Sequence, residues 1–468
     1  AFNFGCLFEK YLITRNETVL LQLRNLMKRG APDYEALVLD YTSAGRFEEA
    51  LAVAELAIAQ PVGEQTLLHY YKSWCLIRLG KTAEAQIAIA TAEKEPADYC
   101  FPNALEAIEA LQCVVDFAGK APKALYYLGN LWYDKRRYPT AIAAWERSSR
   151  EDETFPTVWR NLSLAYFNKM NRPDEAVALL EKAFRLDHTD ARVLMELDQL
   201  YKRLNRPHIE RLCFLEQHID IVMTRDDLYL EYVTLLNQTG QYREAIRRID
   251  QRKFHPWEGG EGKVPAQYQL ARLELSKELI NRKKYDDALA LIDECYIYPT
   301  HLGEGKLPGA QENDFNYYKA YILQQQGRPE EAHSLFVKAC SGNSQPAAAM
   351  YYNDQKPDKI FYQGLAYRKL GEEEKARSRF NQLITYGEEH LFDRFKMDYF
   401  AVSLPDLLIW EDDMDKKNRI HCNYLMALGH LGLGNRTKAE HFFDIAASMD
   451  NNHQGVQIHR KLMNTILS

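Results

Sequence analysis

Small and large apolar positions recur at regular intervals along much of this chain. In segments such as 45–61, 80–96 and 136–152, an alanine at a fixed place is followed by a large or apolar residue about four positions later. This spacing predicts antiparallel helix pairs, because a small residue lets two helices approach closely while larger side chains fill the groove. The marker alanines are Ala50, Ala85, Ala141, Ala176, Ala245, Ala288, Ala332, Ala376 and Ala439.

The segments upstream of several marker alanines have a second pattern. Examples are "ALYYLGNLWYDKRRY" at 124–138 and "IFYQGLAYRKLG" at 360–371. Together with the alanine segments, they resemble the tetratricopeptide repeat, whose pattern is Trp, Leu-Gly, Tyr, then Ala, Phe, Ala and Pro. With one degenerate repeat at about 190–218, about ten helix pairs cover nearly the whole chain. The resemblance implies an all-α superhelical solenoid.

The distance between marker alanines changes along the chain. It is 35 positions from Ala50 to Ala85 and again from Ala141 to Ala176, but 43 or 44 positions at each of the three steps from Ala245 to Ala376. We therefore expect an N-terminal array over 1–225 and a C-terminal array with extended loops over 226–468, within one continuous solenoid. A further insertion near 96–120 has a helical pattern but suggests no function.

The extra residues in the second half fall between the second helix of one repeat and the first helix of the next. The four additions are 253–267, 296–312, 341–358 and 388–418. Equivalent loops of a solenoid emerge on one edge, so we expect them to lie side by side as a ridge or the wall of a cleft.

Histidine, aromatic and carboxylate side chains are concentrated in these four loops. A plain connector has no need of them, and long loops of this composition more often bind a ligand or a protein surface. Aromatic rings beside Asn, Asp, Glu and Gln suit a sugar, and they suit a protein interface equally well. The candidate binding residues are His255, Trp257, Glu258, Glu261, Lys263, His301, Glu304, Lys306, Gln311, Glu312, Tyr352, Asn353, Asp354, Asp406 and Trp410.

The loop "HPWEGGEGKVP" at 255–265 has the glycines and lysine of a nucleotide-binding loop. That motif needs a first glycine where this chain has Trp257, and a Ser or Thr where it has Val264. The loop instead returns as "GEGKLPGAQ" at 303–311. Glycine and proline in both copies are also explained by turn formation alone.

Most other chemistry finds no support in the sequence. A formal net charge of −7 and scattered basic residues disfavour nucleic acid, and no apolar stretch is long enough to span a bilayer. The pattern HExxH and paired CxxC cysteines are absent, so we expect no metal and no cofactor. The eight scattered cysteines favour a reducing compartment. We expect a cytoplasmic protein, or a periplasmic one if a leader was removed, since the chain opens without methionine.

The motifs of the C-terminal half also have a more specific resemblance. "HPWEGGEGKV", "YYNDQKPDKIFYQGLA", "DYFAVSLPDLLIWEDD", "HCNYLMALGHLGLG" and "NNHQG" are similar to the repeat region of bacterial proteins in which a mutarotase-like β-sandwich domain of unknown function precedes the array. The resemblance implies carbohydrate-related work and a companion domain in the same polypeptide.

The sequence therefore predicts a binding or scaffold module that is not an enzyme. Its partner would be a protein or the companion domain. The alternative is that the loops and their carboxylates contribute to a composite site that binds an oligosaccharide or hydrolyses a glycoside, because that chemistry needs only two carboxylates facing each other.

Overall fold

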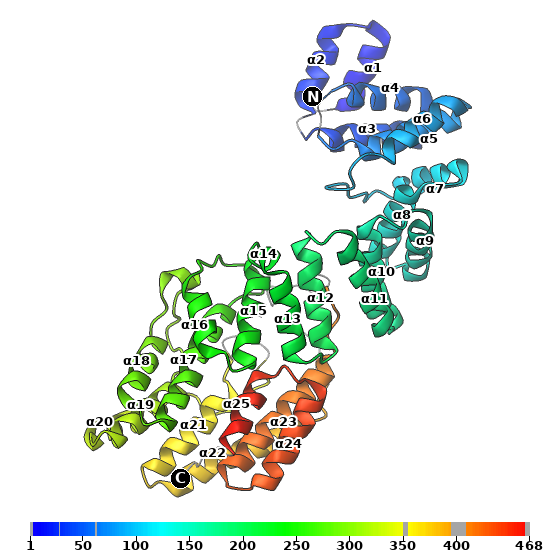
Figure 1. Ribbon diagram of the computed structural model, residues 1–468. Helices are drawn as coiled ribbons and strands as arrows, with labels where there is room; N and C mark the ends of the chain where they lie inside the picture. Colours follow the sequence, from blue (N-terminus) through cyan, green and yellow to red (C-terminus); the bar gives the residue numbers. More distant parts are fainter. Residues whose placement is uncertain (1–2, 28, 61–62, 350–353, 395–408, 464–468) are drawn as a thin grey trace. The chain divides into compact units, whose positions relative to one another are not determined.

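The structure is a computed structural model, which describes residues 3–27, 29–60, 63–349, 354–394 and 409–463. Throughout these residues the regular secondary structure is helical, with no strand (Figure 1). The chain divides into two compact units, Ala1–His188 and Thr189–Ser468. The expected boundary at 225 rests on loop length, not on compactness, and it stays a prediction.

Unit 1 contains eleven helices within the described residues. They are α1 (Phe4–Thr14), α2 (Glu17–Leu26), α3 (Ala31–Ser43), α4 (Phe47–Ile58), α5 (Thr66–Arg78), α6 (Thr82–Ala92), α7 (Glu106–Ala118), α8 (Pro122–Asp134), α9 (Tyr138–Glu151), α10 (Pro156–Met170) and α11 (Pro173–Leu186).

Unit 2 contains the remaining helices of the described chain. They are α12 (Ala191–Arg203), α13 (His208–Gln217), α14 (Ile219–Val222), α15 (Asp226–Gln238), α16 (Tyr242–Asp250), α17 (Lys263–Asn281), α18 (Tyr285–Cys295), the short η1 (Thr300–Leu302), α19 (Asn313–Gln325), α20 (Pro329–Ala339), α21 (Pro357–Lys369), α22 (Glu373–His390), α23 (Met414–Gly432), α24 (Arg436–Met449) and α25 (Gln454–Leu462).

The expected solenoid of about ten helix pairs is confirmed. Every marker alanine lies in the second helix of a pair and is buried, with exposed fractions of 0 to 2%. Because the alanine side chain is small, it allows the two helices of a pair to pack closely at that position. The pairs are α3/α4, α5/α6, α8/α9, α10/α11, α12/α13, α15/α16, α17/α18, α19/α20, α21/α22 and α23/α24.

A glycine opposite an aromatic ring fixes the closest approach within two of these pairs. A Cβ atom placed on Gly129 in α8 would lie 2.2 Å from Nε1 of Trp145 in α9. The same substitution at Gly364 in α21 would place Cβ 2.4 Å from the ring of Phe380 in α22. Both contacts join residues sixteen positions apart, so the two units use the same packing rule.

The insertion near 96–120 forms one extra helix, α7, as its pattern indicates. It packs against both α5 and α8 of unit 1, while Glu93 at the end of α6 still accepts hydrogen bonds from the amides of Lys123 and Ala124 at the start of α8. Its buried face consists of Ala107, Ala110, Leu111, Val114 and Val115. The sequence pattern indicated neither this position of α7 nor helices α1, α2 and α25.

The end of unit 2 folds back onto its beginning. Nη1 of Arg211 in α13 donates to Oδ1 of Asn452 at 2.7 Å, and Nδ2 of Asn452 donates to the carbonyl of Lys202 at 3.0 Å. Gln454 exchanges hydrogen bonds with Gln267 in α17, and the ammonium of Lys461 donates to Tyr242 at 3.0 Å. These contacts of residues 451–461 are called the C-terminal seam below. Figure 1 shows α25 lying among the other helices of unit 2.

Candidate functional site

The extended loops of unit 2 lie where the spacing placed them, between the second helix of one pair and the first of the next. They connect α16 to α17 (251–262), α18 to α19 (296–312) and α20 to α21 (340–356). The fourth connects α22 to α23 (391–413), and only part of it lies within the described residues.

The first two loops are bonded to each other. The amide of Phe254 donates to the carbonyl of His301 at 2.8 Å, and the amide of Gly262 donates to the carboxylate of Glu304 at 2.7 Å. Gly303 has a positive φ of 76° and lies so close to Phe254 that a Cβ there would be 2.7 Å from the Phe254 carbonyl oxygen. Only glycine fits that position without strain. The two loops therefore lie side by side, as expected.

The third loop continues the same row. The side chain of Gln311 donates to the carbonyl of Asp354 at 3.3 Å and accepts from the amide of Lys356 at 3.2 Å. On its other side, the ring of His421 in α23 contacts the carbonyl of Ala347 at 2.8 Å. We call the row formed by residues 253–262, 296–312 and 354–356 the loop wall.

The first loop carries the most exposed candidate side chains of the wall. His255 is 77% exposed, and its ring lies 3.1 Å from the carboxylate of Asp226 at the start of α15. Glu258 and Glu261 are exposed too, as is Lys263, which the structure places just after this loop as the first residue of α17.

Trp257 and Lys263 are in closer contact with the surrounding protein than the other candidates of this region. Trp257 is half-buried because its ring lies against Gly260, where a Cβ would come within 2.3 Å of it. Surrounding protein displaces water from the ammonium of Lys263 and lowers its pKa, and the nearby charge of Lys202 acts in the same direction.

The candidates of the second loop are half-buried or paired. Lys306 forms an ion pair with Glu312. Burial raises the pKa of Glu304. The hydrogen bond from the amide of Gly262 lowers this pKa in part, and the negative charge of Glu261 raises it further. His301 lies 3.7 Å from Asp250, which is itself held by Arg272 at 2.7 Å. These carboxylates mainly organise the wall itself.

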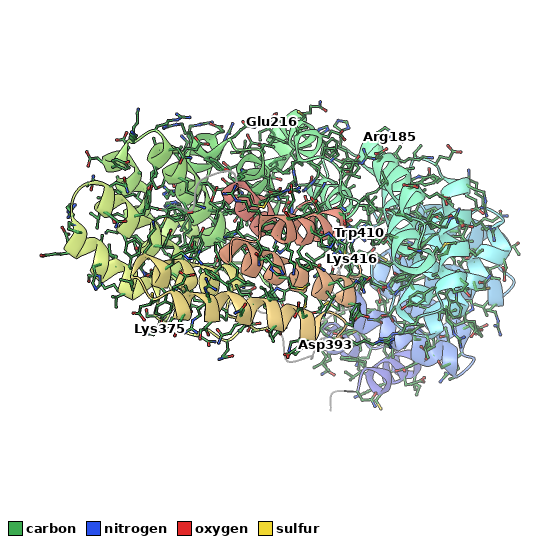
Figure 2. The ribbon with its side chains drawn as sticks, turned by 90° about the horizontal axis from the view of Figure 1, so that it is seen from below. Arg185, Glu216, Lys375, Asp393, Trp410 and Lys416 are labelled. Carbon is green, nitrogen blue, oxygen red and sulfur yellow. The ribbon has the colours of Figure 1, made fainter. Side chains whose placement is uncertain are left out.

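Two groups of candidates do not belong to this surface. Trp410 is buried, with 1% of it exposed. Its indole nitrogen donates to the carbonyl of Glu196 in α12 at 3.1 Å, and its own carbonyl accepts from Arg203. Figure 2 labels its position in unit 2. Trp410 is part of the core, where no ligand reaches it. Tyr352, Asn353 and Asp406 lie outside the described residues.

Asp226 is a residue of this surface that sequence reasoning missed. Burial alone would raise its pKa, but hydrogen bonds from the amide and ring of His255 and from Arg252 hold that pKa below its usual range. Asp226 lies 29 positions before His255, in the first turn of a helix, where an acidic residue is common. Nothing in the loop pattern singles it out.

Other site types receive no support from the described part of the chain. Among these residues, no group of three or more His, Cys, Asp and Glu is arranged to hold a metal ion. No helix within the same ranges is both long and apolar enough to cross a membrane. The arrangement is a polar surface of loops bonded to one another, with its carboxylates either exposed or bonded within the wall.

Two tetratricopeptide repeat family models match parts of the chain, at residues 101–156 and 360–386. These ranges contain the Gly129–Trp145 and Gly364–Phe380 contacts. The chain therefore carries tetratricopeptide repeats. The matches cover one segment of each unit.

Solved structures of repeat proteins are similar only at low identity. The TPR domain of P58(IPK) is 14% identical, with 90% of this chain and 96% of that chain covered at a TM-score of 0.27. The C-terminal part of a TPR repeat-containing protein from Cytophaga hutchinsonii is 16% identical, with 65% and 93% covered at 0.26. MamA from Desulfovibrio magneticus RS-1 is 16% identical, with 42% and 97% covered at 0.25. Scores this low carry no argument about function.

Proposed function

We propose that this chain is a non-catalytic scaffold whose loop wall binds a protein surface. Tetratricopeptide repeats generally mediate protein–protein interaction. The observation that carries the proposal is the bonding of successive loops to one another, from Phe254–His301 through Gly262–Glu304 to Gln311–Asp354. A connector with no binding role has no need of such cross-links.

Pre-organisation is the physical advantage of this wall. Ordering a long loop at the moment of binding costs conformational entropy, which here is already lost on folding. The exposed side chains of His255, Glu258 and Glu261 then provide charged and hydrogen-bonding groups on a fixed frame. Such groups determine the specificity and rate of protein association more than its strength.

The partner we propose is a companion β-sandwich domain of the same polypeptide, which is what the resemblance of the C-terminal motifs to bacterial repeat proteins implies. The test is calorimetric titration of this chain with that domain, expressed separately, and with a panel of oligosaccharides alongside. We expect saturable heat from the domain and none from the sugars.

Charge reversal of the wall locates the binding surface. In the Glu258→Lys, Glu261→Lys double variant we expect the affinity for the domain to fall about tenfold or more. The matched control is Glu330→Lys with Glu374→Lys, two exposed carboxylates on helices of the same unit, and it should bind as the parent does. Equal binding by both variants would contradict the proposal. Heat from a glycan that only the wall variant loses would replace it with the carbohydrate-binding alternative.

A further inference from the structure

The extra helix of unit 1 borders an open groove that the loop wall does not involve. The groove measures about 740 Å³ and lies between the end of α5, the outer side of α7 and α8. Its apolar lining consists of Ile77, Leu105, Ile108, Cys113, Phe117 and Trp132.

Helix α7 is buried on one side and of mixed polarity on the other. The side around Leu111 is buried against α5 and α8. Ile108 and Phe117 are nine positions apart, which places them on opposite flanks of the helix, and both are partly buried against the core of unit 1. Between these flanks, the side chains that line the groove are Glu109, Gln112, Cys113 and Asp116. The apolar part of the lining therefore comes from α5, α7 and α8 together.

Exposed hydrophobic side chains are concentrated in the segment that directly precedes α7 in the sequence. Leu105 in its lining is 64% exposed, and Tyr99 and Phe101 just before it are 86% and 76% exposed. Isolated exposed apolar residues are ordinary on a protein surface. Three such residues within seven positions, one of which lines the groove, are typical of an interaction site.

The charge on the groove selects among partners. Its charged lining residues are Glu109 and Asp116, and no Lys or Arg lines it. Glu109 reaches the exposed Arg78 at 3.3 Å, while Asp116 accepts only a hydrogen bond from Gln112 at 2.8 Å. α7 contains no basic residue at all. Helix α7 therefore presents an acidic row to a groove with an otherwise largely apolar lining, and Arg78 of α5 lies beside Glu109.

We propose that this groove binds an amphipathic helix of a partner protein, with apolar side chains on the face that enters and two basic side chains on one flank. Glu109 and Asp116 are seven positions apart on α7, or about 10.5 Å along the helix axis. Lys or Arg residues seven positions apart on the partner would match them. The stretch from Leu105 to Phe117 spans about 18 Å, which accommodates about three turns of the incoming helix.

A fluorescent peptide of about 14 residues tests this fit, with Leu on one face and two Lys seven positions apart on its flank. Its binding to the full chain is followed by fluorescence anisotropy at low and at physiological salt. We expect saturable binding that weakens with salt, because surface charge pairs are screened.

The decisive variants reverse the rim charges. Glu109→Lys with Asp116→Lys should weaken binding of the Lys peptide about tenfold or more and should restore affinity for the same peptide with Glu in place of Lys. The matched control, Glu48→Lys with Glu84→Lys, changes two exposed carboxylates of the same unit and should leave binding unchanged. Circular dichroism and the unfolding midpoint show that each variant is folded.

The floor of the groove has its own variant, Leu105→Asp, which should weaken binding of both peptides alike. The proposal is overturned if the Lys peptide does not bind, or if it binds the rim variant as well as the parent. It is also overturned if sedimentation shows self-association that Leu105→Asp abolishes, since a second copy of this acidic chain would then cover the groove.

Discussion

In unit 1 the hydrogen bonds between repeats join near neighbours along the array, such as Arg46 to Glu9, 37 positions apart. In unit 2 the C-terminal seam brings Asn452 to the carbonyl of Lys202, 250 positions away. Both units are built from the same helix pairs. The stability of an open array is close to a sum over neighbouring repeats. When the ends are joined, the loss of one end contact weakens the other end too. Unit 2 should therefore unfold more cooperatively than unit 1.

Among the variants proposed below, Arg211→Ala should change the difference in unfolding between the two units most. Its buried guanidinium lies 2.6 Å from Asp198 and 2.8 Å from Glu231, and it binds Asn452. Burial raises the pKa of Asp198 even with Arg211 present. In Arg211→Ala a buried carboxylate loses its partner, which costs about 3–5 kcal/mol. Hydrogen exchange measured by mass spectrometry should accelerate across 189–468 and stay unchanged in 1–188.

The control for this prediction is Arg46→Ala in unit 1. Arg46 pairs with Glu9 and Glu49 at the surface, where water and salt screen the attraction, so the variant should lose little stability. A similar small effect from both variants would show that the seam does not couple the ends of unit 2.

Acid should shift the stability of the two units in opposite directions. Burial lowers the pKa of His459 in unit 2 to about 4, below its ordinary 6.5. As the pH falls, the unfolded chain binds this proton at a higher pH than the folded chain does. The free energy of unfolding of unit 2 should therefore decrease by on the order of 2–3 kcal/mol between pH 6.5 and pH 4. His421 acts in the same direction. In unit 1, burial and the nearby Glu64 raise the pKa of Glu35 to about 7.

Folded unit 1 therefore holds its Glu35 proton more tightly than the unfolded chain does, and this group stabilises unit 1 as the pH falls from 7 to 4.5. Hydrogen exchange, corrected for the intrinsic pH dependence of amide exchange, can follow both units in one sample. Glu35→Gln should flatten the response of unit 1, and His459→Gln should weaken that of unit 2. A parallel response of both units in the parent would refute the prediction.

The glycine–aromatic contact occurs in both units, and its disruption should destabilise each unit by a similar amount. Gly129→Ala and Gly364→Ala each force a methyl group against an aromatic ring and should cost about 1–3 kcal/mol in their own unit. Trp145→Leu and Phe380→Leu make room, so each double variant should lose less than its two single changes added together. Chemical denaturation of the four single and two double variants measures this coupling. Additive losses would mean that the ring is not what opposes the methyl group.

The smallest effect should come from the loop wall. Glu304→Ala removes the acceptor of the Gly262 amide at the start of α17, which costs about 1 kcal/mol or less. Exchange of the amides at 259–263 should accelerate, with the rest of unit 2 unchanged. Glu258→Ala, at an exposed position of the same loop, is the control. No acceleration in Glu304→Ala would show that this bond does not hold the two loops together.

Local periodicity made much of the fold predictable. Ala141 and Ala376, for example, mark the second helix of a pair because helix packing depends on residues a few turns away. The change in spacing after Ala245 also placed the loops correctly. The seam had no such signal, because Asn205 and Asn451 are 246 positions apart and belong to no repeated pattern.

Trp410 shows why candidate site residues were harder to predict. An aromatic residue beside acidic ones, in a long loop, has the composition of a binding site. Its actual environment depends on α12, since its indole donates to Glu196, 214 positions earlier. His255 and Glu304 do lie in the loop wall, because their loops contact their nearest neighbours in the array, and their role in binding stays a prediction.

The seam also sets an order for making the protein. Unit 1 has all of its residues once position 188 has left the ribosome. Asn451, the hydrogen-bond partner of Asn205, is synthesised 246 positions later. At typical rates of translation this takes about 12–50 s. During that interval Arg211 and its carboxylate partners lack the amide of Asn452. Unit 2 therefore completes its fold only after residues 451–461 have been synthesised.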